Sequence, residues 1–278
     1  MTQQERDVGQ AAALHTMVFH YPEGQTIKEH VAPAWNVVIP VAGHINWRAG
    51  RGHGQGVAGA VFPPQIAHHT SSAARHTSVF IDPWHFGLGP GSGRPIALDD
   101  PTVLQLRALW ALDQVGDSEE PARETVAILR RCDLLPAAVS VDPRVAAALR
   151  NLAAAESLAD IALAVGLSPS RLRALFHAYT GTPPARLRMW QRLRVAIASL
   201  SAKPIALAAI DAGFADQAHL TRTATRLLGQ TPADLAPVLL SGRSHRHDDA
   251  LCDTTFRPRH WDHSPGGGHS QGVGFSRE

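Results

Sequence analysis

Two stretches of the sequence place hydrogen-bonding and cationic side chains at the spacing of an exposed helix face. The first stretch exposes Ser170, Arg171, Arg173 and Ala174. The second exposes Gln217, His219, Thr221 and Arg222. An arginine on such a face can pair with guanine through two hydrogen bonds, and the smaller polar groups suit phosphates and base edges. For either stretch alone, a solvated face of an ordinary helical hairpin is an equal alternative.

The two stretches belong to a duplicated unit. LADIALAVGLSPSRLRALFHAYTGTPPARL corresponds, with one inserted residue, to IALAAIDAGFADQAHLTRTATRLLGQTPADL. In each copy an apolar helix ends at Gly166 or Gly213, where a positive φ reverses the chain and a second helix follows. The inward positions of the second helices are Leu172, Leu175 and Phe176 in copy one and Leu220, Thr223 and Ala224 in copy two. Each copy is therefore predicted to be helix, tight turn, helix.

Small residues and caps fit this reading. Ala162 and Ala209 each lie four residues before the turn glycine, where two helices must cross closely. Leu167 or Phe214 follows the glycine as the apolar contact between the helices. Ser168 and Pro169 cap and open the second helix of copy one, and Asp216 or Ala215 begins that of copy two.

A longer helix, PPARLRMWQRLRVAIASLSA, connects the copies. Its apolar stripe is Leu187, Trp190, Leu193, Ile197 and Leu200. At about 1.5 Å per residue, some sixteen residues span about 24 Å. A helix of that length can hold two reading helices about one DNA turn apart on one face of the duplex.

Over residues 142–240 the sequence resembles the AraC/XylS family of bacterial transcriptional regulators. The resemblance rests on the two repeat copies and on the helix after Trp190. It implies base-facing positions at Ser170, Arg171, Arg173 and Ala174 and at Gln217, Ala218, Thr221 and Arg222. Arg173 and Arg222 are the main candidates. We expect three further arginines either to contact phosphates or to support the long helix: Arg186, Arg188 and Arg192.

Copy two departs from the family at Ala224, where an aromatic residue matching Phe176 is usual. Losing a core phenylalanine to alanine typically costs about 3 to 5 kcal/mol when nothing compensates. We therefore expect a locally weaker second unit, with Leu227 and Leu228 as the residues that can fill the space.

The N-terminal part has an all-β pattern. Short β-rich runs such as WNVVIPVAG and HTSVFID alternate with turn signals up to residue 96. VFPPQIAHHT resembles the second cupin signature, with Gln65 where glycine is common. The resemblance implies a jelly-roll β-barrel that senses an effector, followed by two helices at 99–132 that form a dimer contact. Cys132 lies among apolar neighbours and is predicted to be buried.

The predicted fold class is α+β multidomain. It comprises a cupin-like β-barrel with two following helices, then an all-α domain of two helix-turn-helix units joined by a long helix. The predicted divisions are a sensor domain at 1–96, a helical dimerisation segment and linker at 97–140, a DNA-binding domain at 141–240 and a disordered His/Gly-rich tail at 241–278. Asp142 and Pro143 are predicted to start the first helix of the DNA-binding domain.

Nine of the sixteen histidines fall at or before His85. A metal-binding cupin needs a cluster of imidazoles with a carboxylate, yet only His30 and His68 can be assigned as ligands. A barrel without metal or other cofactor is thus the prediction, and a metal ion is the alternative. The candidate walls of an effector pocket are His30, Trp35, Trp47, His68 and Phe80.

Charge and apolar runs narrow the function classes. The formal net charge is only +2, but residues 1–140 hold −3 and residues 141–240 hold +5. A basic segment suits a polyanion partner, and the modest excess predicts few phosphate contacts and a moderate salt dependence. The longest apolar run, Ile205 to Ile210, is far below the ~18 residues that span a bilayer. We expect a cytoplasmic protein without membrane contact.

These observations favour a dimeric, sequence-specific regulator that binds double-stranded DNA and senses a small molecule, with RNA polymerase as a further partner. Coupling is predicted to pass through the helical segment at 98–141. No nucleophile triad, phosphate loop or dinucleotide signature stands in a credible context, so an enzyme is not expected. Two alternatives remain: a metal-dependent cupin enzyme with a helical appendage, and an interaction protein on the same fold that does not bind DNA.

Overall fold

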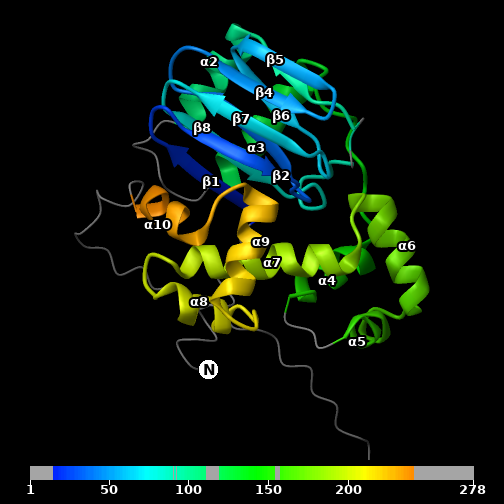
Figure 1. The fold of residues 1–278 in the computed structure, drawn as a ribbon. Helices are drawn as coiled ribbons and strands as arrows, with labels where there is room; N and C mark the ends of the chain where they lie inside the picture. The colour runs from blue at the N-terminus through cyan, green and yellow to red at the C-terminus, as the bar shows by residue number, and fades with distance from the viewer. Residues whose placement is uncertain (1–14, 90, 92, 111–118, 154–156, 241–278) are drawn as a thin grey trace, which may run out of the picture. The chain divides into compact units, whose positions relative to one another are not determined.

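The computed structural model describes residues 15–89, 91, 93–110, 119–153 and 157–240, with strands first and helices second (Figure 1). The strands are β1 (Thr16–Tyr21), β2 (Thr26–His30), β3 (Trp35–Pro40), β4 (Ile45–Ala49), β5 (Gly52–Val57), β6 (Gly59–Phe62), β7 (His68–Ser72), β8 (His76–Ile81) and β9 (Ile96–Leu98). The helices are α2 (Asp100–Leu109), α3 (Glu119–Arg131), α4 (Pro143–Asn151), α5 (Leu158–Ala164), α6 (Pro169–Thr180), α7 (Pro184–Ser199), α8 (Ile205–Asp211), α9 (Gln217–Leu228) and α10 (Pro232–Leu240).

The strands form two antiparallel sheets. One has the order β1-β8-β3-β6-β9 and the other the order β2-β7-β4-β5, so strands far apart in the chain are neighbours. Two sheets connected in this way are typical of a jelly roll. The predicted fold class, a β-barrel with two following helices and then an all-α domain, is confirmed.

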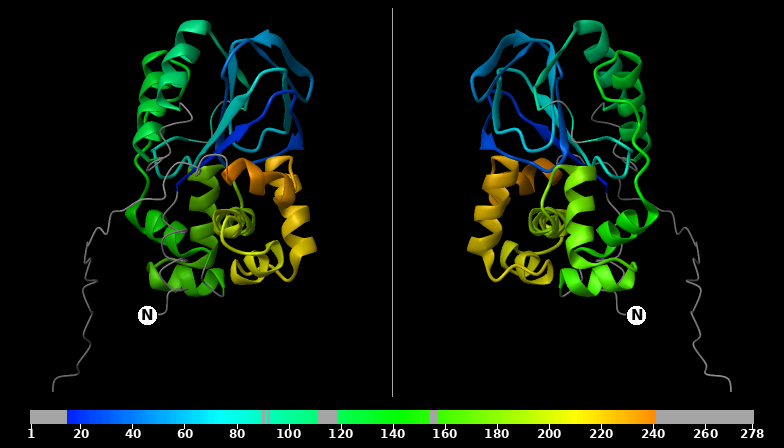
Figure 2. Two further views of the ribbon diagram at one scale, coloured as in Figure 1. Left: turned by 90° about the vertical axis from the view of Figure 1, so that its left-hand side faces the viewer. Right: turned by 90° about the vertical axis from the view of Figure 1, so that its right-hand side faces the viewer.

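Strand β3 is buried on both faces because it separates two apolar layers. Its alternate residues Trp35 and Val37 pack with Val103 and Leu106 of α2. Val38 faces the other way and packs with Phe62 inside the barrel. Figure 2 shows α2 and α3 lying against that outer side of the strands. All six residues of β3 are therefore buried, because apolar layers cover this strand on both faces.

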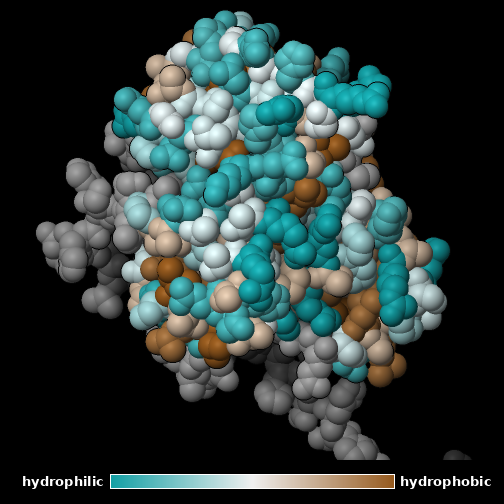
Figure 3. Space-filling view, in the orientation of Figure 1, coloured by the Kyte–Doolittle hydropathy of each residue, from teal (hydrophilic) through white to brown (hydrophobic). Residues whose placement is uncertain are grey.

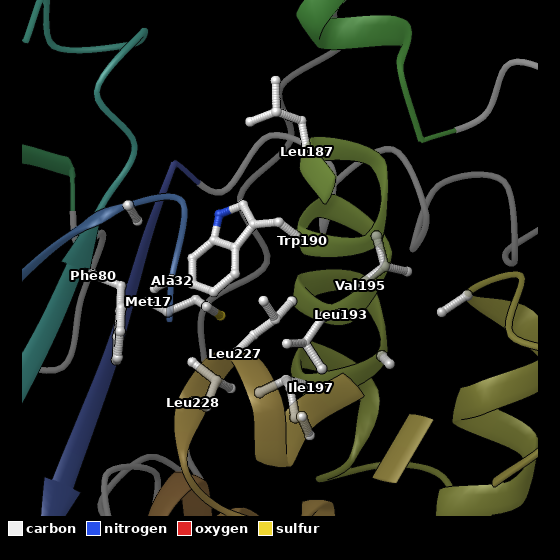
Figure 4. Close-up of a cluster of buried hydrophobic side chains, with 14 of the residues drawn as sticks. Met17, Ala32, Phe80, Leu187, Trp190, Leu193, Val195, Ile197, Leu227 and Leu228 are labelled. Atoms are coloured by element: carbon white, nitrogen blue, oxygen red, sulfur yellow. The ribbon is translucent and has the colours of Figure 1, made fainter. Parts of the chain in front are cut away.

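A third apolar cluster joins strands of the barrel to the helical region. It includes Met17 and Phe80 from the strands, Trp190 and Leu193 from α7, and Leu228 from α9. Figure 4 shows the strand and helix side chains of this cluster pointing toward one another around the Trp190 indole. The core of the helical domain is therefore continuous with that of the barrel.

The sequence also led to expectations about Cys132, about membrane-spanning helices and about the C-terminal tail. Cys132 is exposed and not buried, because it comes one residue after α3 ends and so leaves the apolar face of that helix. Among the described residues no helix combines the length and apolarity needed to cross a membrane. The tail at 241–278 lies outside the described residues, so the prediction of disorder there stays a prediction.

Candidate nucleic-acid interface

Two helix-turn-helix units are built by the same local devices. In the first, Gly166 at φ +65° reverses the chain after α5, and the Ser168 hydroxyl accepts a hydrogen bond from Arg171 N at 3.2 Å to cap α6. In the second, Gly213 at φ +80° follows α8, and Asp216 caps α9 by accepting from His219 N at 2.6 Å. Both turns and both N-caps follow the sequence prediction.

The helix crossings are close because the residues there are small. Ala162 and Ala209 are fully buried, and Phe214 is nearly so. The long helix α7 covers sixteen residues, and its predicted stripe from Leu187 to Leu200 is buried. A straight helix of this length spans about 24 Å. Helix α7, which we call the strut because it separates the two helix-turn-helix units, thus has the predicted length.

The outer face of α6 is open. The exposed residues among the candidates are Ser170, Arg171, Arg173 and Ala174. Ser170, Arg173 and Ala174 share one face at helical spacing, whereas Arg171 lies about 100° further round the helix than Ser170. Arg144 is the main cause that lowers the pKa of Asp142, and Arg171 contributes, which places Arg171 toward the start of α4. Arg173 is therefore the cation best placed to read bases.

The outer face of α9 divides in the same way. Gln217, Ala218 and Arg222 are exposed, while His219 and Thr221 are half-buried. The His219 ring stands edge-on to Phe214 at 5.2 Å, and Thr221 Oγ1 donates to Gln217 O at 2.9 Å. His219 therefore packs against the turn and the Thr221 hydroxyl is engaged within its own helix. Among the candidate residues of this face, Gln217 and Arg222 are the long side chains that are exposed and make no side-chain hydrogen bond to another described residue.

Sequence reasoning missed one candidate on α6. His177 is exposed and lies four residues after Arg173, so both stand on one helix face. An imidazole can donate to or accept from a base edge or a phosphate. The i, i+4 spacing from Arg173 was the signal that could have found it.

Three arginines of α7 bond to the protein itself. Arg188 Nε donates to Leu152 O at 3.1 Å, and Arg192 Nη1 donates to Gly213 O at 2.9 Å. Arg186 Nη1 donates to Gln65 Oε1 of the barrel. Of the two roles predicted for them, these contacts favour support of the long helix.

Ala224, which stands where the first unit has Phe176, is fully buried. Leu227 and Leu228 are also fully buried, and Figure 4 shows both beside the Trp190 and Met17 side chains. The end of α9 rests on the barrel, where Val31 N donates to Arg226 O at 3.0 Å. The two leucines and the barrel therefore close the space that the sequence suggested was poorly filled.

Four of the five predicted pocket residues come together in the barrel. Ring contacts run in a row from Trp47 to Phe62 at 5.8 Å, His68 at 3.8 Å, His30 at 4.2 Å and Phe80 at 6.2 Å. Trp35 does not join them. Because neighbouring residues of a strand face opposite sides, Trp35 packs toward α2 while Asn36 faces the histidines.

The two histidines are held as neutral acceptors. Burial lowers the pKa of His30 to about 4 and lowers that of His68 well below its usual value. Their Nδ1 atoms lie 2.9 Å from the backbone oxygens of Lys28 and Ile66, which leaves Nε2 as the acceptor. His68 Nε2 lies 3.1 Å from Asn36 Nδ2. Within the described residues, His30 Nε2 and Asn36 Oδ1 have no partner.

A metal centre is not assembled around these imidazoles. Within the described ranges no three His, Cys, Asp or Glu side chains lie together as a ligand set. The neighbour of the two imidazoles is the Asn36 amide, which is a weaker metal ligand than a carboxylate. Among the described residues, the side chains around His30 and His68 do not form the ligand set of a cupin metal site.

Comparison with known proteins agrees with this geometry. Residues 161–236 match the family model described as a helix-turn-helix domain. The structure of ToxT from Vibrio cholerae superposes with a TM-score of 0.54 at 10% identity, covering 80% of this chain and 97% of ToxT. ToxT bound to an unsaturated fatty acid gives a TM-score of 0.54 at 8% identity, covering 80% and 94%.

One further structure matches over a shorter region. An AraC-type DNA-binding transcriptional regulator from Chromobacterium violaceum is 29% identical over 34% of this chain and 90% of its own, with a TM-score of 0.32. No curated protein sequence matches.

The paired helix-turn-helix units follow the barrel in one chain, and residues 161–236 form a helix-turn-helix domain. Two such units in this region are what the resemblance to the AraC/XylS family implied. The two-sheet barrel followed by helices is the fold that ToxT also has.

Proposed function

We propose that the chain reads two neighbouring DNA boxes, one with α6 and one with α9, and that a small molecule in the barrel regulates this reading. The observation that carries the proposal is the pair of free cations on the open faces, Arg173 and Arg222. Both are exposed, and neither has a side-chain hydrogen bond within the described part of the chain. Free guanidinium groups on two helices joined by one strut suit adjacent turns of the major groove.

The barrel is proposed to take a neutral effector that donates hydrogen bonds. His30 Nε2 and Asn36 Oδ1 are buried acceptors without a partner among the described residues, and aromatic rings surround them. Both histidines are uncharged near neutral pH because burial lowers their pKa values. A hydroxyl or amide donor therefore fits this group better than an anion does.

The remaining parts of the proposal concern the partners of the protein and its location in the cell. We propose a homodimer formed through α2 and α3, on which Leu104 is 67% exposed, and contact with RNA polymerase at the promoter. We propose a cytoplasmic regulator without cofactor or enzymatic activity. Metal analysis of the purified protein tests the rival enzyme: stoichiometric iron, manganese or nickel lost in His30→Ala and His68→Ala would favour it.

Selection of duplexes from a random DNA library, followed by affinity measurement, tests the DNA-binding proposal. Arg173→Ala and Arg222→Ala should each weaken binding to the selected duplex by about 1 to 3 kcal/mol and relax one base preference. Arg51→Ala removes an equal charge from an exposed position just before β5 and is the matched control. Unchanged affinity in the double variant would contradict the proposal, and absence of any salt-dependent duplex binding would favour the interaction protein.

A further inference from the structure

Three side chains on one face of α7 bond to the barrel. Arg186, Trp190 and Arg194 follow one another at intervals of four residues, which places them along the same side of the helix. Arg186 reaches Gln65, whereas Trp190 and Arg194 both reach Asp82. The helix that separates the two reading units is therefore attached to the barrel along most of its length.

Asp82 follows β8 and has both carboxylate oxygens occupied by α7. Oδ1 accepts from Trp190 Nε1 at 2.8 Å, and Oδ2 accepts from Arg194 Nη1. Asp82 is 1% exposed and Arg194 is 3% exposed. Burial lowers the pKa of Arg194 to about 9, which still leaves its guanidinium charged at neutral pH. The result is a fully buried ion pair between the barrel and the strut.

Gln65 makes the second attachment. Its φ of +66° lies in the left-handed region, which is strained for a residue with a side chain. Its side chain donates from Nε2 to Thr182 Oγ1 at 2.8 Å and accepts from Arg186 through Oε1. Glycine would adopt this backbone without strain but could make neither bond. The contacts with the turn before α7 and with α7 offset the conformational cost.

Aromatic packing fills the space between the two attachments. The Phe80 ring lies 5.8 Å from that of Trp190 and 6.2 Å from that of His30. Phe80 therefore touches both the proposed effector group and the strut. Figure 4 shows Phe80 and Met17 on the strand side of the Trp190 indole. The contacts from His30 through Phe80 to Trp190 therefore connect the barrel directly to α7, without passing through α2 or α3.

We propose that Asp82 and Gln65 are positioning residues for DNA recognition, which fix α7 and through it the separation and rotational phase of α6 and α9. The inference rests on the proposed two-box reading. A buried ion pair often adds little net stability, but it disfavours arrangements that leave either charge unpaired. Sliding or turning α7 against the barrel would unpair Asp82, so one geometry of the strut is selected.

The consequence for DNA is a strict spacing between the boxes. Two helices fixed in phase bind boxes on one face of the duplex, and an insertion of about 5 bp places the second box on the opposite face. A strut free to move would tolerate small insertions better. The preference for spacing, measured apart from affinity for a single box, therefore reports on the positioning role and not on folding alone.

The experiment uses the full chain and duplexes that the wild type selects from a random library. Affinity is measured for the selected duplex, for versions with one to five base pairs inserted between the boxes, and for a single box. Gln65→Gly removes both side-chain bonds while relieving the backbone, and Asp82→Asn removes the charge at nearly constant shape. Each should reduce the ratio of affinities between the selected and the inserted duplexes by at least about fivefold, with single-box affinity retained.

One control and one alternative variant keep the outcomes distinct. Glu23→Gln removes an exposed carboxylate from the turn before β2 and should leave the ratio unchanged. Should Asp82→Asn not fold, Asp82→Leu combined with Arg194→Met replaces both charges by apolar groups and tests the same point. A wild-type ratio in folded Gln65→Gly and in a folded Asp82 variant would overturn the inference. Failure of the wild type to select any duplex would instead overturn the proposed function.

Discussion

The two helix-turn-helix units share a design but differ in what completes their cores. The first closes α6 with its own Phe176, which is fully buried. The second has Ala224 at that position and ends against the barrel, where Arg226 O accepts from Val31 N. A duplicated unit has thus become two unequal ones: the first relies on its own aromatic core, and the second completes its packing with the barrel. An effector-driven change in the barrel should reach α9 before α6.

The largest effect is expected from removing the aromatic core of the first unit. Phe176→Ala should lower the free energy of unfolding by about 3–5 kcal/mol, because a fully buried ring leaves a cavity. A urea denaturation curve, monitored by circular dichroism, measures this loss of unfolding free energy. A loss under about 1 kcal/mol would show that the first unit does not depend on this ring.

The reverse substitution in the second unit sharpens the contrast. Ala224→Phe should destabilise by about 1–3 kcal/mol, because Leu227, Leu228 and the barrel already occupy the space. Stabilisation by Ala224→Phe would instead reveal an unfilled site and contradict this account of the second unit.

An intermediate effect is expected where α9 meets the barrel. Gly229 has φ +74°, and a Cβ there would contact Lys28 O and approach Ile27 Cγ2 to 2.8 Å. Gly166 has a similar φ of +65° but open space around its Cβ position. Both alanine variants should lose about 1–2 kcal/mol from the backbone strain. Gly229→Ala should lose about 1–3 kcal/mol more, from displacement of the backbone and of Ile27.

Thermal unfolding of the Gly166 and Gly229 variants, together with their affinity for the selected duplex, distinguishes the two contributions. The barrel contact matters if only Gly229→Ala loses affinity for the box read by α9. Equal losses in the two variants would mean that the docking of α9 on the barrel adds nothing.

A dependence on pH also originates in the barrel. Three histidines have a pKa lowered to about 4, mainly by burial: His15, His30 and His76. Between pH 6.5 and about 4 the unfolded chain binds protons that the native histidines do not, so stability falls as the pH falls. The more deeply buried His30 and His76 each contribute about 1.4 kcal/mol per pH unit in that range and nothing further above it, and the partly exposed His15 contributes less because solvent screens its charge.

Unfolding midpoints between pH 7 and pH 5 measure this slope. His30→Gln should flatten it, and the exposed His53→Gln should not. An unchanged slope in His30→Gln would show that acid does not act through the barrel interior.

Local signals accounted for most of the helical domain. Turn glycines, N-caps, small crossing residues and the stripe of α7 follow from spacing and side-chain type alone, because each acts within a few residues of chain. The interpretation of Gln65 as a substituted glycine position also held, since its φ is positive. Trp35 was misplaced because burial on both faces of β3 removes the alternation that would reveal its direction.

Long-range partners could not be found in this way. Nothing near Asp82 in the chain indicates that Trp190 and Arg194 occupy its two oxygens, more than a hundred residues away. The same holds for Gln65 with Arg186 and for the closure of the second unit by β2. Such pairs depend on how two domains pack, and many side chains in the sequence carry the same chemistry without meeting a partner.

By itself, the sequence determined that two helix-turn-helix units exist, which faces they expose and how long a helix separates them. Those features are set by helix periodicity, capping and backbone conformation, which are local. Only the tertiary structure decided that the barrel holds the strut by a buried ion pair and completes the second unit. Burial creates those constraints, because the free energy that a charge or a small core residue contributes depends on the groups that surround it in the folded chain.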